Sequence, residues 1–311
     1  MRERWEEEIR ERTRARWPEE RIRRELGDKQ RMLPLVESAP LLRALGLLDG
    51  RGDLSRDTRR KYLQIDHMVS LLEVTVKELM RAHPVVRIID VACGSSYLTA
   101  ALGWCFTHRW HHPCRILGVD RNADVVARSR ERAELARLDD SLRFAAASIG
   151  ELDTPTAWRD TFDEPLGPGD VHALFALHAC DTATDEALAL GVGLEAEIIA
   201  AAPCCQAELA RSWAGLARDE VPGAFAPIWA SPHMRREAGA TMTDALRSLL
   251  LGTAGYQVTV MAFVPPAHTP KNTMLRARRG GVDPDRARAE YLALRESLGN
   301  AAIALERLLE S

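Results

Sequence analysis

The sequence lacks any uninterrupted apolar run long enough to cross a bilayer, and its first residues, MRERWEEEIRERTRARW, are charged throughout. A transmembrane helix needs about 20 consecutive apolar residues, and a secretory signal needs an apolar segment near the amino terminus. We therefore expect a cytoplasmic protein that does not interact with a membrane.

The sequence also has few cysteines and no excess of basic over acidic residues. The six cysteines, two of them adjacent at Cys204 and Cys205, do not form the framework of paired spacings seen in secreted domains. We expect thiols that pack in the core or line a site. The 42 Lys and Arg residues face 45 Asp and Glu residues, a net charge of −3. Overall charge therefore gives no attraction for nucleic acid, although a local basic patch stays open.

Residues 1–80 contain no strand-like apolar run. Charges of both signs recur at helical spacing around a sparse apolar stripe of Trp5, Ile9, Trp17, Ile22 and Leu26. Because Glu and Asp are interleaved with the Arg, this pattern favours a solvated helical extension over a basic surface for a phosphate backbone. The stretch YLQIDHMVSLLEVTVKELM then predicts an amphipathic helix.

From residue 85 the pattern changes to short apolar runs without polar alternation, as in parallel strands covered on both faces. The runs are VVRIIDVA, CRILGVD, LRFAAAS, VHALFALH and AEIIAAAP. Helical stretches of crossover length separate most of them, which predicts a doubly wound, Rossmann-like α/β sheet.

The end of this region departs from alternation, because the runs YQVTVMAFVPP and TMLRARR are joined by a short connection and must be antiparallel neighbours. A parallel sheet closed by a C-terminal antiparallel hairpin is the arrangement of class I S-adenosylmethionine (AdoMet) methyltransferases. We predict a helical extension over 1–80, a methyltransferase domain over 81–280 and a C-terminal helical segment over 281–311.

The first candidate motif is IIDVACGSSYLTAAL, where a strand ends near Asp90 and turns into a helix. Asp90, Ala92 and Gly94 are its cofactor-binding candidates. Gly94 would let backbone N–H groups approach a ligand that a Cβ would exclude. AdoMet places its methionine portion here and has no pyrophosphate, so fewer glycines suffice than in a dinucleotide fingerprint. Ala92 and Ser96 stand where methyltransferases often have glycine. Taken alone, the motif also fits a plain strand-to-helix turn.

The second motif is RILGVDRNADVV, one βαβ unit downstream. Asp120 ends this strand and could accept hydrogen bonds from both ribose hydroxyls of a nucleoside cofactor. Asn122 could cap the next helix, which leaves Asp120 free for a ligand. Four further strand-end residues are cofactor-binding candidates, namely Arg121, Ser148, Ile149 and Leu177, of which Ser148 and Ile149 could flank an adenine.

The third pair of motifs is LFALHACDTATDEAL and IIAAAPCCQAEL, at the ends of the fourth and fifth strands. Ligands gather at the carboxyl ends of strands in such sheets. The catalytic candidates around this crevice are His178, Cys180, Asp181, Cys204 and Cys205. His178 titrates near neutral pH and could serve as a base, or it could simply bond to backbone.

The same motifs also allow purely structural roles. Asp181, Asp185 or Thr184 could cap the next helix. The cysteines and His178 are zinc-ligand types, but their spacing is not that of a zinc finger or ribbon, so no metal is predicted.

LHACDTATDEAL followed by APCCQAEL resembles a methyltransferase branch that includes the tRNA acceptor-stem 2′-O-methyltransferases and bacterial relatives, with a domain of the methyltransferase-32 type. KYLQIDHM and TDALRSLLLGTAGYQVTVMAFVPPAHTPKN also resemble the bacterial members, so the likeness spans roughly residues 61–279. It differs at Ala92, lacks a His after the cysteine pair, and lacks N-terminal Cys/His zinc modules.

The resemblance implies S-adenosyl-L-methionine as cofactor, RNA (tRNA) as acceptor class, and a pre-strand helix whose Gln64 contacts the cofactor. We predict an AdoMet-dependent methyltransferase. A small-molecule acceptor, a non-catalytic AdoMet-fold protein that binds RNA or a partner, and a dinucleotide oxidoreductase are the alternatives. The lack of Asn-Pro-Pro-Tyr after the fourth strand disfavours methylation of adenine N6.

Overall fold

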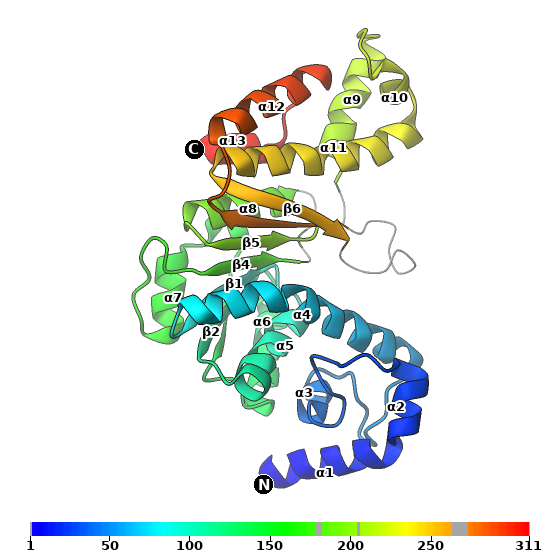
Figure 1. The fold of residues 1–311 in the computed structure, drawn as a ribbon, viewed down its shortest axis with the longest axis vertical. Coiled ribbons are helices and arrows are strands. Elements are labelled where there is room, and N and C mark those ends of the chain that lie inside the picture. Colours follow the sequence, from blue (N-terminus) through cyan, green and yellow to red (C-terminus); the bar gives the residue numbers. More distant parts are fainter. Residues whose placement is uncertain (1, 178, 180–181, 204–205, 263–272, 311) are drawn as a thin grey trace. The chain divides into compact units, whose positions relative to one another are not determined.

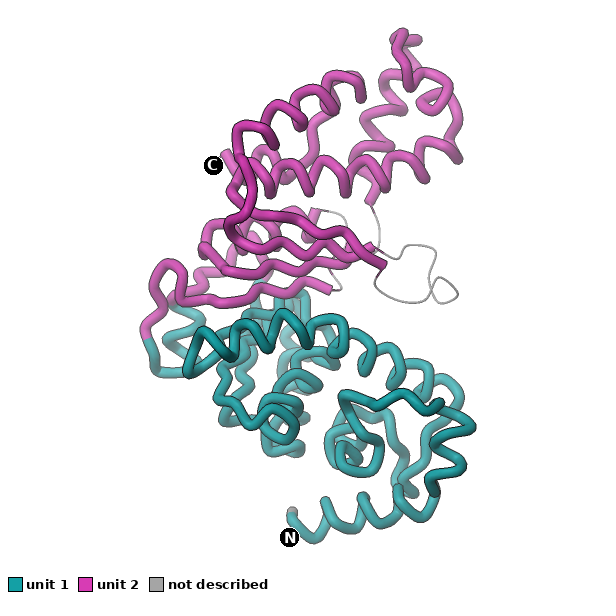
Figure 2. Tube along the Cα trace, in the orientation of Figure 1, with its two compact units in different colours: residues 1–147, 156–164 teal, residues 148–155, 165–311 magenta. Residues whose placement is uncertain are grey.

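The computed structural model describes residues 2–177, 179, 182–203, 206–262 and 273–310 of the chain. It divides into two compact units, one of residues 1–147 and 156–164 and one of residues 148–155 and 165–311 (Figure 2). The domain boundaries at residues 80 and 280 stay a prediction. No helix among the described residues has both the length and the apolar content that spanning a membrane requires.

The first unit opens with the predicted helical extension (Figure 1). Its helices are α1 (Arg2–Arg16), α2 (Glu19–Leu26), α3 (Ala39–Ala44) and α4 (Arg56–Ala82). Helix α4 begins before the predicted amphipathic stretch, because Ser55 caps it by accepting a hydrogen bond from the Thr58 N–H over 3.1 Å. From the predicted apolar stripe, Ile9, Trp17 and Leu26 are buried.

Three parallel strands follow in the same unit. They are β1 (Val86–Val91), β2 (Cys114–Asp120) and β3 (Leu142–Ala146), with β2 in the middle. The crossovers are α5 (Tyr97–Cys105), continued by one π-helical turn, η1 (Phe106–Trp110), and α6 (Ala123–Leu135). Strands β1 and β2 are buried along nearly their whole length, which explains why their sequences are apolar without alternation. The elements η2 (Ile149–Glu151) and α7 (Thr154–Phe162) come next in the chain.

The second unit holds β4 (Ala173–Ala176) and β5 (Ile198–Ala201), which are parallel, and the hairpin of β6 (Tyr256–Ala262) and β7 (Thr273–Arg279). Strand β7 pairs antiparallel with β5. The strand order is β3-β2-β1-β4-β5-β7-β6. This order, parallel strands closed by a C-terminal antiparallel hairpin, confirms the predicted fold class.

Helices complete the second unit (Figure 1). They are α8 (Thr182–Gly193), α9 (Glu208–Arg218), α10 (Ala226–Ala230), α11 (Pro232–Thr253), α12 (Pro284–Ser297) and α13 (Ala304–Glu310). The sequence predicts α8, α11 and the C-terminal helices, but not α9 and α10. These two helices pack against each other and against α11 through Trp213 and Trp229, whose ring centroids lie 6.4 Å apart.

Candidate cofactor-binding loop

The loop after β1 has an unusual backbone. Ala92, Gly94 and Ser96 all have left-handed φ angles, of 52°, 52° and 58°. An L-residue in this region costs about 1–2 kcal/mol, and only glycine adopts it freely. The strain therefore falls on Ala92 and Ser96, the two positions where the sequence departs from the glycines common in methyltransferases. Strain of this kind is typical of ligand-binding sites.

Three hydrogen bonds hold the loop in this conformation. The N–H of Cys93 donates to the Val119 carbonyl over 3.0 Å, and the N–H of Gly94 donates to Oδ2 of Asp120 over 2.9 Å. The Ser96 hydroxyl donates to the hydroxyl of Ser129 on α6 over 2.6 Å. The loop is thus tied to the end of β2 and to the helix that follows it.

The Asp120 carboxylate accepts two backbone N–H groups, and its contact with a ribose stays a prediction. Its Oδ1 accepts the Asn122 N–H over 3.0 Å, and its Oδ2 accepts the Gly94 N–H. Each carboxylate oxygen has a second lone pair, so each retains the capacity to accept a hydroxyl. Asn122 caps α6, accepting the N–H groups of Asp124 and Val125 over 3.0 and 3.2 Å. This confirms the expected capping role of Asn122.

The loop leaves open space beside Gly94, and the backbone N–H groups at the start of α5 lack a capping bond from Ser96. A Cβ built on Gly94 would meet no atom within 4 Å. Ser96 stands at the N-cap position of α5 but its side chain makes no capping hydrogen bond. The first N–H groups of α5 therefore have no side-chain acceptor there, and a helix N-terminus of this kind binds carboxylates and phosphates. These features fit the methionine portion of AdoMet.

Two cations lie at the same end of α5. The Lys61 ammonium is 3.9 Å from the ring centroid of Tyr97, and the Arg132 guanidinium is 5.8 Å from it. Arg132 also donates to the Ser95 carbonyl over 3.0 Å. A positive potential next to an uncapped helix start favours an anionic group. Gln64 is exposed on α4, and its contact with a cofactor stays a prediction.

Asp90 is placed differently from Asp120. Its side chain is buried, and its Oδ2 accepts the Thr99 hydroxyl of α5 over 2.5 Å. Burial raises the pKa of Asp90 to about 7, the Thr99 hydrogen bond opposes this rise, and the Asp120 charge adds to it. Asp90 therefore orients α5 from inside the unit, while its direct contact with a cofactor stays a prediction.

The sequence did not point to Thr99, Ser129 or Arg132. The available signal was weak: two hydroxyls at positions that a helix buries, where an apolar residue is usual. The partners of these residues lie 9 to 37 positions away in the chain.

In the second unit, the cofactor candidates are spread over two segments. The Ser148 hydroxyl donates to Glu151 over 2.6 Å, Ile149 begins η2, and Leu177 is buried. Arg121, in the first unit, is exposed. The catalytic candidates lie outside the described residues, namely His178, Cys180, Asp181, Cys204 and Cys205. Their roles stay predictions.

The idea that Asp185 caps α8 is wrong. The helix begins at Thr182, so Asp185 lies too far inside it to be the cap. Its two carboxylate oxygens accept hydrogen bonds from Nε and Nη2 of Arg247, over 2.8 and 2.6 Å. Thr184 is also inside α8, and its hydroxyl donates to the Ala179 carbonyl over 3.0 Å.

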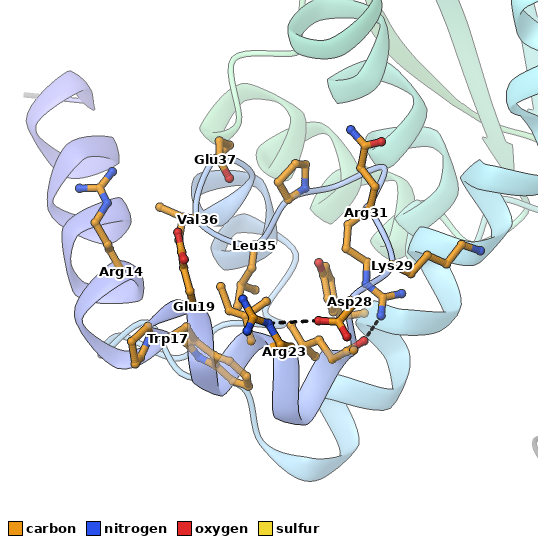
Figure 3. Close-up of a pocket in the computed structure, with 17 residues that line it drawn as sticks. Arg14, Trp17, Glu19, Arg23, Asp28, Lys29, Arg31, Leu35, Val36 and Glu37 are labelled. Carbon is orange, nitrogen blue, oxygen red and sulfur yellow. Dashed lines mark hydrogen bonds and ion pairs between the residues drawn. The ribbon is translucent and has the colours of Figure 1, made fainter.

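The first unit also contains a cavity of about 700 Å³ in the helical extension (Figure 3). Its wall is formed by the α1–α2 turn, α2 and the segment leading to α3, with Trp17 and Tyr62 buried in it. Arg23 and Asp28 form an ion pair of 3.2 Å across its edge. None of the residues of the β1 loop lines this cavity, so it is distinct from the candidate cofactor site.

Residues 60–212, just under half of the chain, match the family model described as a methyltransferase domain, Methyltransf_32. The match and the strand order together show an AdoMet-dependent methyltransferase domain with the class I fold. The matched segment runs from α4 to α9, so it contains the β1 loop, Asp120 and the ends of β4 and β5. AdoMet is accordingly the cofactor.

The solved structures that the chain matches share low sequence identity and low TM-scores with it. Magnesium protoporphyrin IX methyltransferase from Synechocystis shares 12% identity over 78% of this chain and 93% of that chain, with a TM-score of 0.42. The Podospora anserina methyltransferase PaMTH1 shares 14% identity over 84% of this chain and 96% of that chain, with a TM-score of 0.43. A putative O-methyltransferase from Klebsiella pneumoniae shares 12% identity over 86% of this chain and 99% of that chain, with a TM-score of 0.41. These values identify no acceptor. No curated protein matched the sequence.

Proposed function

We propose that this methyltransferase acts on a small-molecule acceptor. The observation that carries the proposal is the neutralised charge of the helical extension, the part of the chain richest in arginine. RNA binding draws its affinity largely from cations that replace the counterions of phosphates. A surface for RNA should therefore present cations without acidic partners.

Many arginines of the extension are instead paired with nearby carboxylates. Examples are Arg4 with Glu8 and Arg21 with Glu25, both at 3.0 Å. Glu6 of the extension is likewise paired with Arg137, which follows α6, at 2.9 Å. Exposed pairs of this kind contribute little to stability, but they cancel local charge. With a net charge of −3 over the whole chain, they favour a small acceptor over a polyanion.

The chain's own residues supply binding and orientation on the cofactor side. Asp120 accepts ribose hydroxyls while it holds the loop through Gly94, and the uncapped start of α5 receives the carboxylate. Lys61 and Arg132 add positive potential there. Bound AdoMet supplies an electrophilic methyl group on a sulfonium. Methyl transfer is an in-line displacement, so its barrier falls mainly through such positioning.

On the acceptor side, we assign His178 as the base that removes the proton of a hydroxyl acceptor. Cys180, Asp181, Cys204 and Cys205 would line the acceptor. This assignment rests on their sequence positions at the ends of β4 and β5.

Transfer of radiolabel tests the proposal. The protein is incubated with methyl-labelled AdoMet and, in separate reactions, with total RNA and with a small-molecule extract. We expect label in the small-molecule fraction only. Label confined to RNA would overturn the small-molecule acceptor and favour a tRNA-type substrate. Binding of AdoMet without transfer to either fraction would favour a non-catalytic protein.

A further inference from the structure

A buried ionic network connects three segments of the second unit. Arg247, in the middle of α11, forms the bidentate pair with Asp185 and also reaches Asp244 at 3.4 Å. The Gln206 side-chain amide in turn donates to Oδ1 of Asp244. Arg247 and Asp185 are each about 1% exposed, and Asp244 about 8%.

The network joins the two sequence motifs to α11. Asp185 is the last residue of the A-T-D element after β4, and Gln206 directly follows the cysteine pair after β5. Thr184, next to Asp185, donates its hydroxyl to the Ala179 carbonyl over 3.0 Å. Asp185 is therefore not available as a substrate ligand, because both of its carboxylate oxygens accept hydrogen bonds from Arg247.

Stability alone does not account for such a network. Removing charges from water is expensive, and well-packed apolar residues often replace a buried ion pair at no loss of stability. What a guanidinium offers is geometry, because its planar fork binds a carboxylate at two points and fixes the orientation of both groups. Burial would lower the pKa of Arg247, but Asp185 and Asp244 reverse this and raise it, so the guanidinium stays charged.

We propose that Arg247 is a positioning residue for methyl transfer, which holds the segments after β4 and β5 through Asp185 and Gln206. This inference rests on the proposed function, since those segments carry the acceptor-side candidates. It implies that Arg247 acts on turnover and not on cofactor affinity. Asp185 and Asp244, the carboxylates that Arg247 binds, are not among the cofactor candidates.

The test uses the full chain with methyl-labelled AdoMet and the small-molecule extract. The variants are Arg247→Lys, which keeps the charge but loses the fork, and Gln206→Met. Gln206→Met is the milder change, because it removes one donor together with an Oε1 that has no partner among the described residues. We expect both to lower kcat about tenfold or more, because misplacement by about 1 Å costs up to ~10²-fold. The KM for AdoMet and the affinity for S-adenosylhomocysteine should stay within about twofold.

A matched control is the pair Arg295 and Glu306, which lie 2.8 Å apart in the same unit and touch neither motif. Arg295→Lys should leave kcat unchanged. If the wild-type chain transfers methyl groups and the folded Gln206→Met variant has the same kcat, the inference is overturned and the proposed function is left intact. Loss of kcat only in proportion to loss of folded protein would also overturn it. Absence of transfer by the wild-type chain would instead count against the proposed function.

Discussion

Gly94 and Asp120 are 26 residues apart in the sequence, yet the N–H of Gly94 donates to the Asp120 carboxylate over 2.9 Å. The bond joins the loop after β1 to the end of β2. It means that the residue predicted to bind ribose also sets the conformation of the loop predicted to bind the methionine portion. The two halves of the candidate site are therefore coupled.

Gly94→Ala should weaken cofactor binding far more than folding. The new Cβ meets no protein atom within 4 Å, so the fold bears only the strain of the left-handed φ, about 1–2 kcal/mol. In the bound state the methyl group would occupy the space of the ligand, and we expect the affinity for S-adenosylhomocysteine to fall at least about tenfold, or ~1.4 kcal/mol. Calorimetry and thermal unfolding measure the two effects.

Gly169→Ala is the matched control for that variant. Gly169 also has a positive φ, of 77°, and open space around its Cβ position, but it lies in the other unit. It should lose similar stability and keep full affinity. Equal affinity of the Gly94 and Gly169 variants would contradict the role of Gly94.

Ala92→Gly and Ser96→Gly should differ in their effect on stability. At Ala92, glycine relieves the left-handed strain, and we expect a gain of about 0.5–1 kcal/mol after the entropic penalty of glycine. Ser96→Gly relieves similar strain but loses the 2.6 Å hydrogen bond to Ser129, so no gain is expected. Chemical denaturation measures both. Stabilisation by Ser96→Gly as large as by Ala92→Gly would show that the hydroxyl pair contributes nothing.

Asp90 should make stability depend on pH. Its folded pKa of about 7 is raised above the unfolded value by burial. Between about pH 4 and pH 7 the folded chain keeps the proton that the unfolded chain has lost, so stability falls as pH rises through this window. Asp90→Asn removes this titration, so its free energy of unfolding should increase relative to that of the wild type as the pH rises from about 4 to about 7. Parallel pH profiles of the two proteins would contradict the raised pKa.

Asn122→Ala should separate capping from binding. Loss of the cap of α6 should lower stability by about 1 kcal/mol without changing cofactor affinity, because the backbone N–H that Asp120 accepts is retained. Asp283 caps α12 in the same way, so Asp283→Ala provides a reference for the stability loss. A cofactor affinity that drops with Asn122→Ala would show that the side chain itself takes part in binding.

Most of the sheet could be predicted because each strand is a continuous apolar run, such as CRILGVD for β2, that only a doubly covered strand explains. The antiparallel hairpin followed from the short connection between its strands. The position of Asp120 at the end of β2 could be predicted because the apolar run CRILGVD fixes where that strand ends. Features that depend on a partner far away in the chain were not predictable.

Two features show what the sequence alone does not predict. The left-handed backbone at Ala92 and Ser96 contradicts the preferences of both residue types, so composition gives no hint of it. Asp185 lies near the predicted start of a helix, and its acidic side chain suggested a cap, but it is inside α8. Its actual partner, Arg247, is 62 residues away and is set by the packing of α11.

The central claim is that this chain binds AdoMet through Asp120 and the loop that Asp120 holds, and calorimetry with S-adenosylhomocysteine tests it most directly. The wild-type chain should bind the ligand with one site. Asp120→Ala should bind at least about tenfold more weakly while remaining folded, because a hydrogen bond to a charged group contributes ~1.5–3 kcal/mol. Failure of the wild-type chain to bind either S-adenosylhomocysteine or AdoMet, or unchanged affinity in Asp120→Ala, would contradict the claim.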